Sequence, residues 1–158
     1  MDSPSLPIRM LMNTDGSVTS LLEASFAAPI AVETRTNTVD HARPRSLRRT
    51  AILRDSATGR PLLRASSELA LDRLPPAART ALIGGSEPIG AILRSARLET
   101  RREILHRTTD TATADDAAEL GIAPGSPVFE RTYEILSYSR RIAVVTERLP
   151  ASLFEDAA

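Results

Sequence analysis

The stretch that decides the fold is RIAVVTERLP, residues 141–150, near the C-terminus. Neither of its two alternating sets of side chains is polar before Thr146, which predicts a strand buried on both faces. The next residue, Glu147, shares a face with Ala143 and Val145, because side chains on a strand repeat every two residues. Glu147 is therefore either the first solvated residue after a buried strand or a carboxyl group held in an apolar pocket. Position alone favours the first interpretation, since charged side chains are seldom buried without a partner.

A second candidate residue, Arg49, strengthens the pocket interpretation. It lies in a predicted strand over residues 47–54, where it shares the drier face with Ala51 and Leu53. An arginine among small and apolar neighbours needs an anion, because a guanidinium group does not lose its charge. The alternative is that Arg49 only reaches the edge of the sheet.

The remaining pattern predicts one α+β domain with a six-stranded antiparallel sheet. We expect a flexible start at residues 1–8, a domain over 9–154 and a tail at 155–158. A helix follows Ser17, its expected N-cap. Two further short helices, over 74–84 and 87–94 with Ser86 as a possible N-cap, form an insert that covers one face or acts as a lid. The other elements are strands at 29–39, 60–71, 98–109, 128–138 and 140–149 and a small helix within 110–121.

Composition excludes several classes of function. The chain has 158 residues, no net formal charge, no Cys and two His, and all 20 of its basic residues are Arg. A missing basic excess argues against nucleic-acid binding. Without Lys or Cys there is no amine for a Schiff base and no thiol nucleophile, disulfide or cysteine metal site. With two imidazoles, a multi-histidine metal site is not expected, so we predict no metal and no cofactor.

Targeting signals are not expected either. No apolar run approaches the roughly 20 residues of a membrane span, and the N-terminus lacks the order of a signal peptide. We therefore predict a cytoplasmic protein with no membrane or nucleic-acid partner. An exposed edge strand would permit a dimer, but a monomer is equally compatible with the sequence.

Several local strings, in this order and spacing, resemble the chorismate pyruvate-lyase family over about residues 11–154. They are Asp15-Gly16-Ser17-Val18-Thr19, Arg49, Asp72-Arg73-Leu74-Pro75, Pro88-Ile89-Gly90, Leu98-Glu99-Thr100, Val145-Thr146-Glu147 and Leu149-Pro150-Ala151-Ser152.

The resemblance implies a six-stranded antiparallel sheet with helical flaps over a sheltered pocket, and a carbon–oxygen lyase that releases 4-hydroxybenzoate and pyruvate from chorismate. It implies that Arg49 holds the ring carboxylate and that Glu147 lies at the opposite end of the ring. Ile89 and Gly90 would contact the ligand from the flap, and Val18 would form an apolar wall. Burial of Glu147 in an apolar pocket would then favour a carboxylic acid that donates a proton or a hydrogen bond.

One departure and two alternatives accompany this interpretation. Members of the family usually carry a charged residue where this chain has Ser66, which would remove a second electrostatic contact to the substrate. Residues 117–128 also resemble effector-sensing domains of bacterial transcription regulators, which bind a metabolite without turning it over. The roughly 10 residues ahead of the domain are expected to be too short for a helix-turn-helix module. A third interpretation is a related pocket adapted to another elimination or cyclisation in specialised metabolism.

Overall fold

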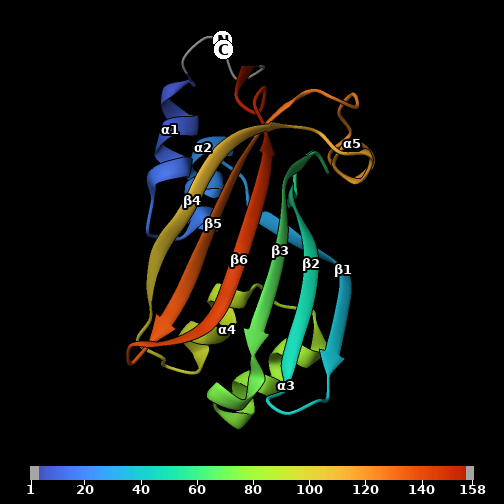
Figure 1. Ribbon diagram of the computed structural model, residues 1–158. Helices are drawn as coiled ribbons and strands as arrows, with labels where there is room; N and C mark the ends of the chain where they lie inside the picture. The colour runs from blue at the N-terminus through green and yellow to red at the C-terminus, as the bar shows by residue number, and fades with distance from the viewer. Residues whose placement is uncertain (1–3, 156–158) are drawn as a thin grey trace.

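The computed structural model describes residues 4–155, in which six strands form one antiparallel sheet of order β1-β2-β3-β6-β5-β4 (Figure 1). This confirms the predicted α+β fold class. The strands are β1 (Ile30–Asp40), β2 (Ser46–Asp55), β3 (Pro61–Ala70), β4 (Arg101–Thr111), β5 (Pro127–Ser137) and β6 (Arg140–Pro150). The strand that contains the opening stretch, β6, pairs with β3 on one side and β5 on the other. The prediction that this stretch is buried on both faces is wrong for one of them: Ala143, Val145 and Glu147 are buried, whereas Val144 and Thr146 on the other face are half-buried.

Five α-helices accompany the sheet, and their ends follow local sequence signals. They are α1 (Leu6–Asn13), α2 (Val18–Phe26), α3 (Pro76–Gly84), α4 (Ile89–Ser95) and α5 (Ala114–Leu120), with a short 3-10 turn at Leu71–Arg73. The side chain of Ser17 caps α2 by accepting a hydrogen bond from the Ser20 N–H, as predicted. Helix α5 begins with a capping box between Thr113 and Asp116.

Two hydrophobic cores lie on one face of the sheet, which we call the inner face. One core joins the strands to α3 and α4 through residues such as Leu82 and Ile92. The other joins them to α1 and α2 through residues such as Ile8 and Leu22. In Figure 1, α1 and α2 lie toward one end of the strands, and α3 and α4 lie toward the other. Because each core occupies one end of the strands, the middle of the inner face lies between them.

The opposite, outer face is covered only in part. Helix α5 packs against β3 and β6 near one end of this face. A row of hydroxyl side chains crosses the rest, including Thr36 and Thr50, and Thr132 and Thr146, which hydrogen-bond across neighbouring strands. The outer face is therefore polar where α5 does not reach it.

The structure differs from the sequence-based prediction at several boundaries, three of which have a clear consequence for the fold. Residues 6–8, predicted to be flexible, belong to α1, because Ile8 is fully buried in a core and Pro7 occupies a first-turn position that a helix accepts. Residues 1–3 and 156–158 of the predicted flexible ends lie outside the described residues. The N-cap of α4 is Pro88 rather than Ser86, and β4 begins at Arg101, three residues later than predicted.

Between residues 4 and 155, no helix has the length and apolar character needed to cross a membrane.

Candidate functional site

The candidate site is a cavity of about 230 Å³ enclosed by the inner face, α2 and α4. The strand pattern explains its position. On β2, Arg49 and Ala51 lie between Leu47 of one core and Leu53 of the other, and the same interruption occurs around Glu147 on β6. Small and charged residues thus leave a space where the two cores do not meet. A cavity of this size suits a small ligand.

Glu147 lies in a buried cluster with two residues of β5. The Arg131 Nε donates to Glu147 Oε2 at 2.7 Å, and the Tyr133 hydroxyl donates to Glu147 Oε1 at 3.0 Å. The two Nη1 hydrogen bonds of Arg131 go to the backbone oxygens of Leu11 and Thr14, at 2.8 and 2.7 Å. Arg131 is 1% exposed and Glu147 is 5% exposed, so this is an ion pair inside the protein. Such a pair fixes the direction of the carboxylate toward the cavity.

The surroundings of Tyr133 keep its hydroxyl protonated. Burial raises the pKa of Tyr133, and the negative charge of Glu147 raises it further. Guanidinium groups lie over its ring, with Cζ of Arg131 at 4.9 Å and Cζ of Arg102 at 5.9 Å from the ring centre. Tyr133 therefore remains a hydrogen-bond donor to Glu147.

Arg49 is buried, with 3% of its surface exposed. Its Nη2 donates to Thr34 Oγ1 at 3.0 Å and to the backbone oxygen of Glu87 at 2.7 Å, which ties β2 to the segment before α4. Burial lowers the pKa of Arg49, yet the group stays charged at any ordinary pH. Its Nη1 is buried and has no hydrogen-bond partner among the described residues. A buried donor of this kind is costly unless a ligand satisfies it.

Arg49 and Glu147 stand on the same cavity wall, separated by small residues. They lie on β2 and β6, with β3 between them, so their strands are roughly 10 Å apart. In the register of the sheet, Ser67 of β3 lies beside Arg49 and Ala65 of β3 lies beside Glu147, with Ala51 next to Ala65. The guanidinium and the carboxylate are therefore at two ends of a floor built from short side chains.

The other residues predicted from the family resemblance also line this cavity. Val18 reaches it from the first turn of α2, and Ile89 and Gly90 reach it from the first turn of α4. The structure thus places all five predicted residues on one cavity. What each does to a ligand stays a prediction.

The environment predicted for Glu147 is wrong. We expected an apolar pocket that favours the protonated acid, but its two carboxylate oxygens accept hydrogen bonds from Arg131 and Tyr133. Two donors therefore hold the carboxyl group of Glu147 where an apolar lining was expected, and its role toward a ligand stays a prediction.

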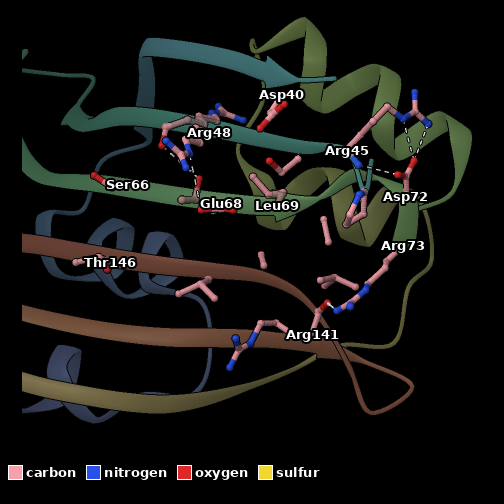
Figure 2. Close-up of a pocket in the computed structure, with 18 of the residues that line it drawn as sticks. Asp40, Arg45, Arg48, Ser66, Glu68, Leu69, Asp72, Arg73, Arg141 and Thr146 are labelled. Carbon is pink, nitrogen blue, oxygen red and sulfur yellow. Dashed lines mark hydrogen bonds and ion pairs between the residues drawn. The ribbon is translucent and has the colours of Figure 1, made fainter. Parts of the chain in front are cut away.

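The loss of a substrate contact that we expected at Ser66 does not apply, because Ser66 does not face the cavity. Ser66 lies on the outer face, in a shallow groove of about 840 Å³, together with Thr146, Arg48 and Glu68 (Figure 2). Its side chain is not among those that line the inner cavity. A missing charge at this position therefore removes nothing from the site.

Sequence reasoning missed four residues of the site, Arg131, Tyr133, Arg94 and Arg102. Arg131 carried the same signal as Arg49, because it is an arginine between apolar residues on one face of a strand. That signal would have identified it as a buried cation in need of an anion, without indicating which one. Arg94 and Arg102 follow patterns that are typical of solvated surfaces, so no local signal distinguishes them from other surface arginines.

No three His, Cys, Asp or Glu side chains form a group that could hold a metal ion within the part of the chain that the structure describes.

Comparisons with solved structures identify the same fold in other bacterial proteins, among them some described as transcriptional regulators. PhnF from Mycobacterium smegmatis matches with a TM-score of 0.69 and 15% identity, over 87% of this chain and 65% of PhnF. The effector domain of PhnF matches with a TM-score of 0.63 and 16% identity, over 85% of this chain and 88% of that domain. The SA0254 product of Staphylococcus aureus matches with a TM-score of 0.65 and 10% identity, over 87% and 89%. At such identities the likeness shows the fold alone, and this chain spans about two thirds of the PhnF chain.

No curated protein is similar enough to this chain to count as a match. The sequence model of one family does match, over residues 12–156, a range that includes every residue of the cavity described above. That family is described as Rv2949c-like chorismate pyruvate-lyase. Since the match covers nearly the whole chain, the protein belongs to the Rv2949c-like chorismate pyruvate-lyase family.

Proposed function

We propose that the protein is a chorismate pyruvate-lyase that converts chorismate into 4-hydroxybenzoate and pyruvate without a cofactor. The observation that carries this proposal is the placement of Arg49 and Glu147 at the two ends of a floor of small side chains in one cavity. Family membership supports the class of reaction.

Arg49 anchors the ring carboxylate in this proposal. Its Nη1 is a buried donor that lacks a partner among the described residues, as is Nη2 of Arg131, and its own Nη2 is already held by Thr34 and Glu87. A guanidinium with a fixed plane and a free edge binds a carboxylate with little loss of conformational entropy. The ring then lies over Ser67 and Ala65, with its opposite end near Glu147.

The reaction needs one proton to move. The ring hydrogen beside the breaking bond leaves as a proton, and its electron pair makes the ring aromatic. The ether bond between ring carbon and oxygen breaks with its electrons on oxygen, and the released enolate of pyruvate takes a proton on its methylene carbon. Of the two carboxylates that line the cavity, Glu23 is exposed and Glu147 is buried. Glu147 is therefore the base, and Arg131 and Tyr133 are positioning residues that hold it in place.

Positioning and exclusion of water supply the rest of the catalysis. Aromatisation provides the driving force, so the protein has to orient the ring and stabilise the charge that develops on the leaving oxygen. No step calls for a metal or an organic cofactor.

The direct test is to incubate the pure protein with chorismate and to measure pyruvate and 4-hydroxybenzoate. We expect the two products in equal amounts, and we expect Glu147→Gln to reduce kcat by roughly 100-fold or more, as the loss of a positioned base does. Arg49→Gln should raise KM and weaken binding of 4-hydroxybenzoate. Arg48→Gln, on the outer face of the same strand, is the matched control and should leave turnover unchanged. Turnover that survives Glu147→Gln would refute the assignment of the base.

A second candidate function is metabolite sensing without turnover, and the likeness to the effector domain of PhnF favours it. In that case chorismate would be recovered unchanged. Aromatic carboxylic acids would still raise the melting temperature of the protein, and Arg49→Gln would abolish that shift.

A further inference from the structure

Two more arginines line the same cavity, Arg94 at the end of α4 and Arg102 on β4. Apart from the contact of Arg102 with the face of the Tyr133 ring, neither side chain has a hydrogen bond or an ion pair with any residue from 4 to 155. The other acidic residue of the cavity wall, Glu23 on α2, is exposed and accepts a long hydrogen bond of 3.5 Å from the N–H of Ile30. Two cations thus border the cavity with no protein anion assigned to them.

The two guanidinium groups approach one point beside Gly90. A Cβ atom at that position would lie 3.4 Å from Arg94 Nη1 and 3.6 Å from Arg102 Nη2. Because Gly90 has no Cβ atom, the space beside it is open, and both guanidinium groups reach into that space. Arg94 is exposed and Arg102 is half-buried. Like charges this close repel each other, and an anion between them would remove the part of the repulsion that solvent and salt do not screen.

We propose that Arg94 and Arg102 bind a second carboxylate, so that the site is built for a dicarboxylate ligand. This inference rests on the proposed function, and it identifies the second carboxylate as that of the enolpyruvyl group of chorismate. Arg49 holds the ring carboxylate, and the pair formed by Arg94 and Arg102 holds the carboxylate of the leaving group. Both arginines reach the cavity from the inner side of the sheet, whereas Ser66 lies on the outer face.

Two separate carboxylate sites would make the products bind more weakly than the substrate. After the ether bond breaks, the two carboxylates belong to separate molecules. 4-Hydroxybenzoate keeps only the contact with Arg49. Pyruvate keeps only the contacts with Arg94 and Arg102. The substrate is held at two points and each product at one, so turnover itself weakens the binding of what remains in the site.

The test compares the substrate with the monocarboxylate product. Arg94→Gln, Arg102→Gln and the double variant are assayed for KM and kcat with chorismate, and their Kd for 4-hydroxybenzoate is measured by calorimetry. We expect KM for chorismate to rise by roughly 10- to 100-fold, as for loss of a charged hydrogen bond. The Kd for 4-hydroxybenzoate should change less than about threefold. The control is Arg101→Gln, an exposed neighbour on β4 that pairs with Glu103 and does not line the cavity.

Binding of chorismate to Glu147→Gln separates this inference from the proposed function. If the wild-type protein forms no pyruvate, the lyase proposal fails. A selective loss of chorismate affinity when Arg94→Gln and Arg102→Gln are added to Glu147→Gln would still support the dicarboxylate site. The inference is overturned if these substitutions leave chorismate affinity unchanged, or if they weaken 4-hydroxybenzoate as much as chorismate. Circular dichroism spectra that match the wild type show that the variants are folded.

Discussion

Arginines lie on both faces of the sheet, but the number of acidic side chains that pair with them differs between the faces. On the outer face, Arg148 contacts Asp110, Asp116 and Glu130, and Arg64 contacts Asp116 and Glu119. Elsewhere on that face, Arg45 pairs with Asp72 and Arg48 lies 3.8 Å from Glu68 (Figure 2).

On the inner face, the arginines exceed the acids that could neutralise them. Arg131 is matched by Glu147, but Arg49, Arg94 and Arg102 face the cavity without an acidic partner among residues 4–155. The outer charges thus satisfy one another and attach α5 to the sheet, whereas the three unpaired inner arginines are the ones that we propose bind a ligand. The protein as a whole has no net charge, so composition conceals this separation.

The largest effect should come from breaking the buried pair. Arg131→Met leaves Glu147 buried without its cation, and we expect the free energy of unfolding to fall by about 3–5 kcal/mol. Arg141→Met is the control, because Arg141 pairs with Glu134 on the outer face while 54% of its side chain is exposed. Urea unfolding followed by circular dichroism measures both. Equal losses in the two variants would show that the inner pair is no more important than a surface pair.

The outer network should give a smaller effect that depends on pH. Burial acts to raise the pKa of Asp116, but hydrogen bonds from Thr113 and Arg148 outweigh it and hold that pKa below the ordinary value of 3.8. A carboxyl group with a lowered pKa in the folded state stabilises the protein above its ordinary pKa, and this contribution is lost as the pH falls through the folded value.

We therefore expect Asp116→Asn to cost about 1–3 kcal/mol of unfolding free energy at pH 7, as for a buried charged hydrogen bond. The difference from the wild type should shrink when the same unfolding curves are recorded below pH 3.8. A difference that is constant across this range would show that the charge of Asp116 is not what stabilises α5.

Adjacent residues of β3 offer a test of the two faces within one strand. Ser67 lines the inner cavity and Ser66 lies on the outer face. Ser67→Leu should fill the floor beneath the ligand and weaken 4-hydroxybenzoate binding by about tenfold or more, which is about 1.4 kcal/mol. Ser66→Leu should leave that affinity unchanged. Calorimetric titration measures the Kd of both variants for 4-hydroxybenzoate. Equal losses of affinity in the two variants would show that the ligand does not bind over Ser67.

The smallest effect should come from the exposed pair of Arg48 and Glu68. Both side chains are more than half exposed, so solvent and salt screen their attraction. Arg48→Ala should shift the midpoint of urea unfolding by no more than the error of the measurement. A clear loss of stability would show that the outer face depends on its surface pairs more than we infer.

Much of the fold could be predicted because strand alternation is a local property. The six strands, the cap at Ser17 and the C-terminal hairpin all follow from residues close together in the chain. Helix α1 was missed because its stability comes from burial of Ile8 against distant strands, which composition does not reveal. Family resemblance, rather than any local pattern, linked Arg49 to Glu147.

The sequence by itself determined which side chains share a face, since a strand period of two assigns Arg49 and Glu147 to faces without reference to other strands. Only the tertiary structure decided which charges meet. Glu147 is paired with Arg131 because the β5–β6 register sets them opposite each other. Arg94 and Arg102 reach one point because the side chain of Arg102, from β4, extends to Gly90 in the first turn of α4. Such encounters depend on packing between distant elements, and no periodicity along the chain encodes them.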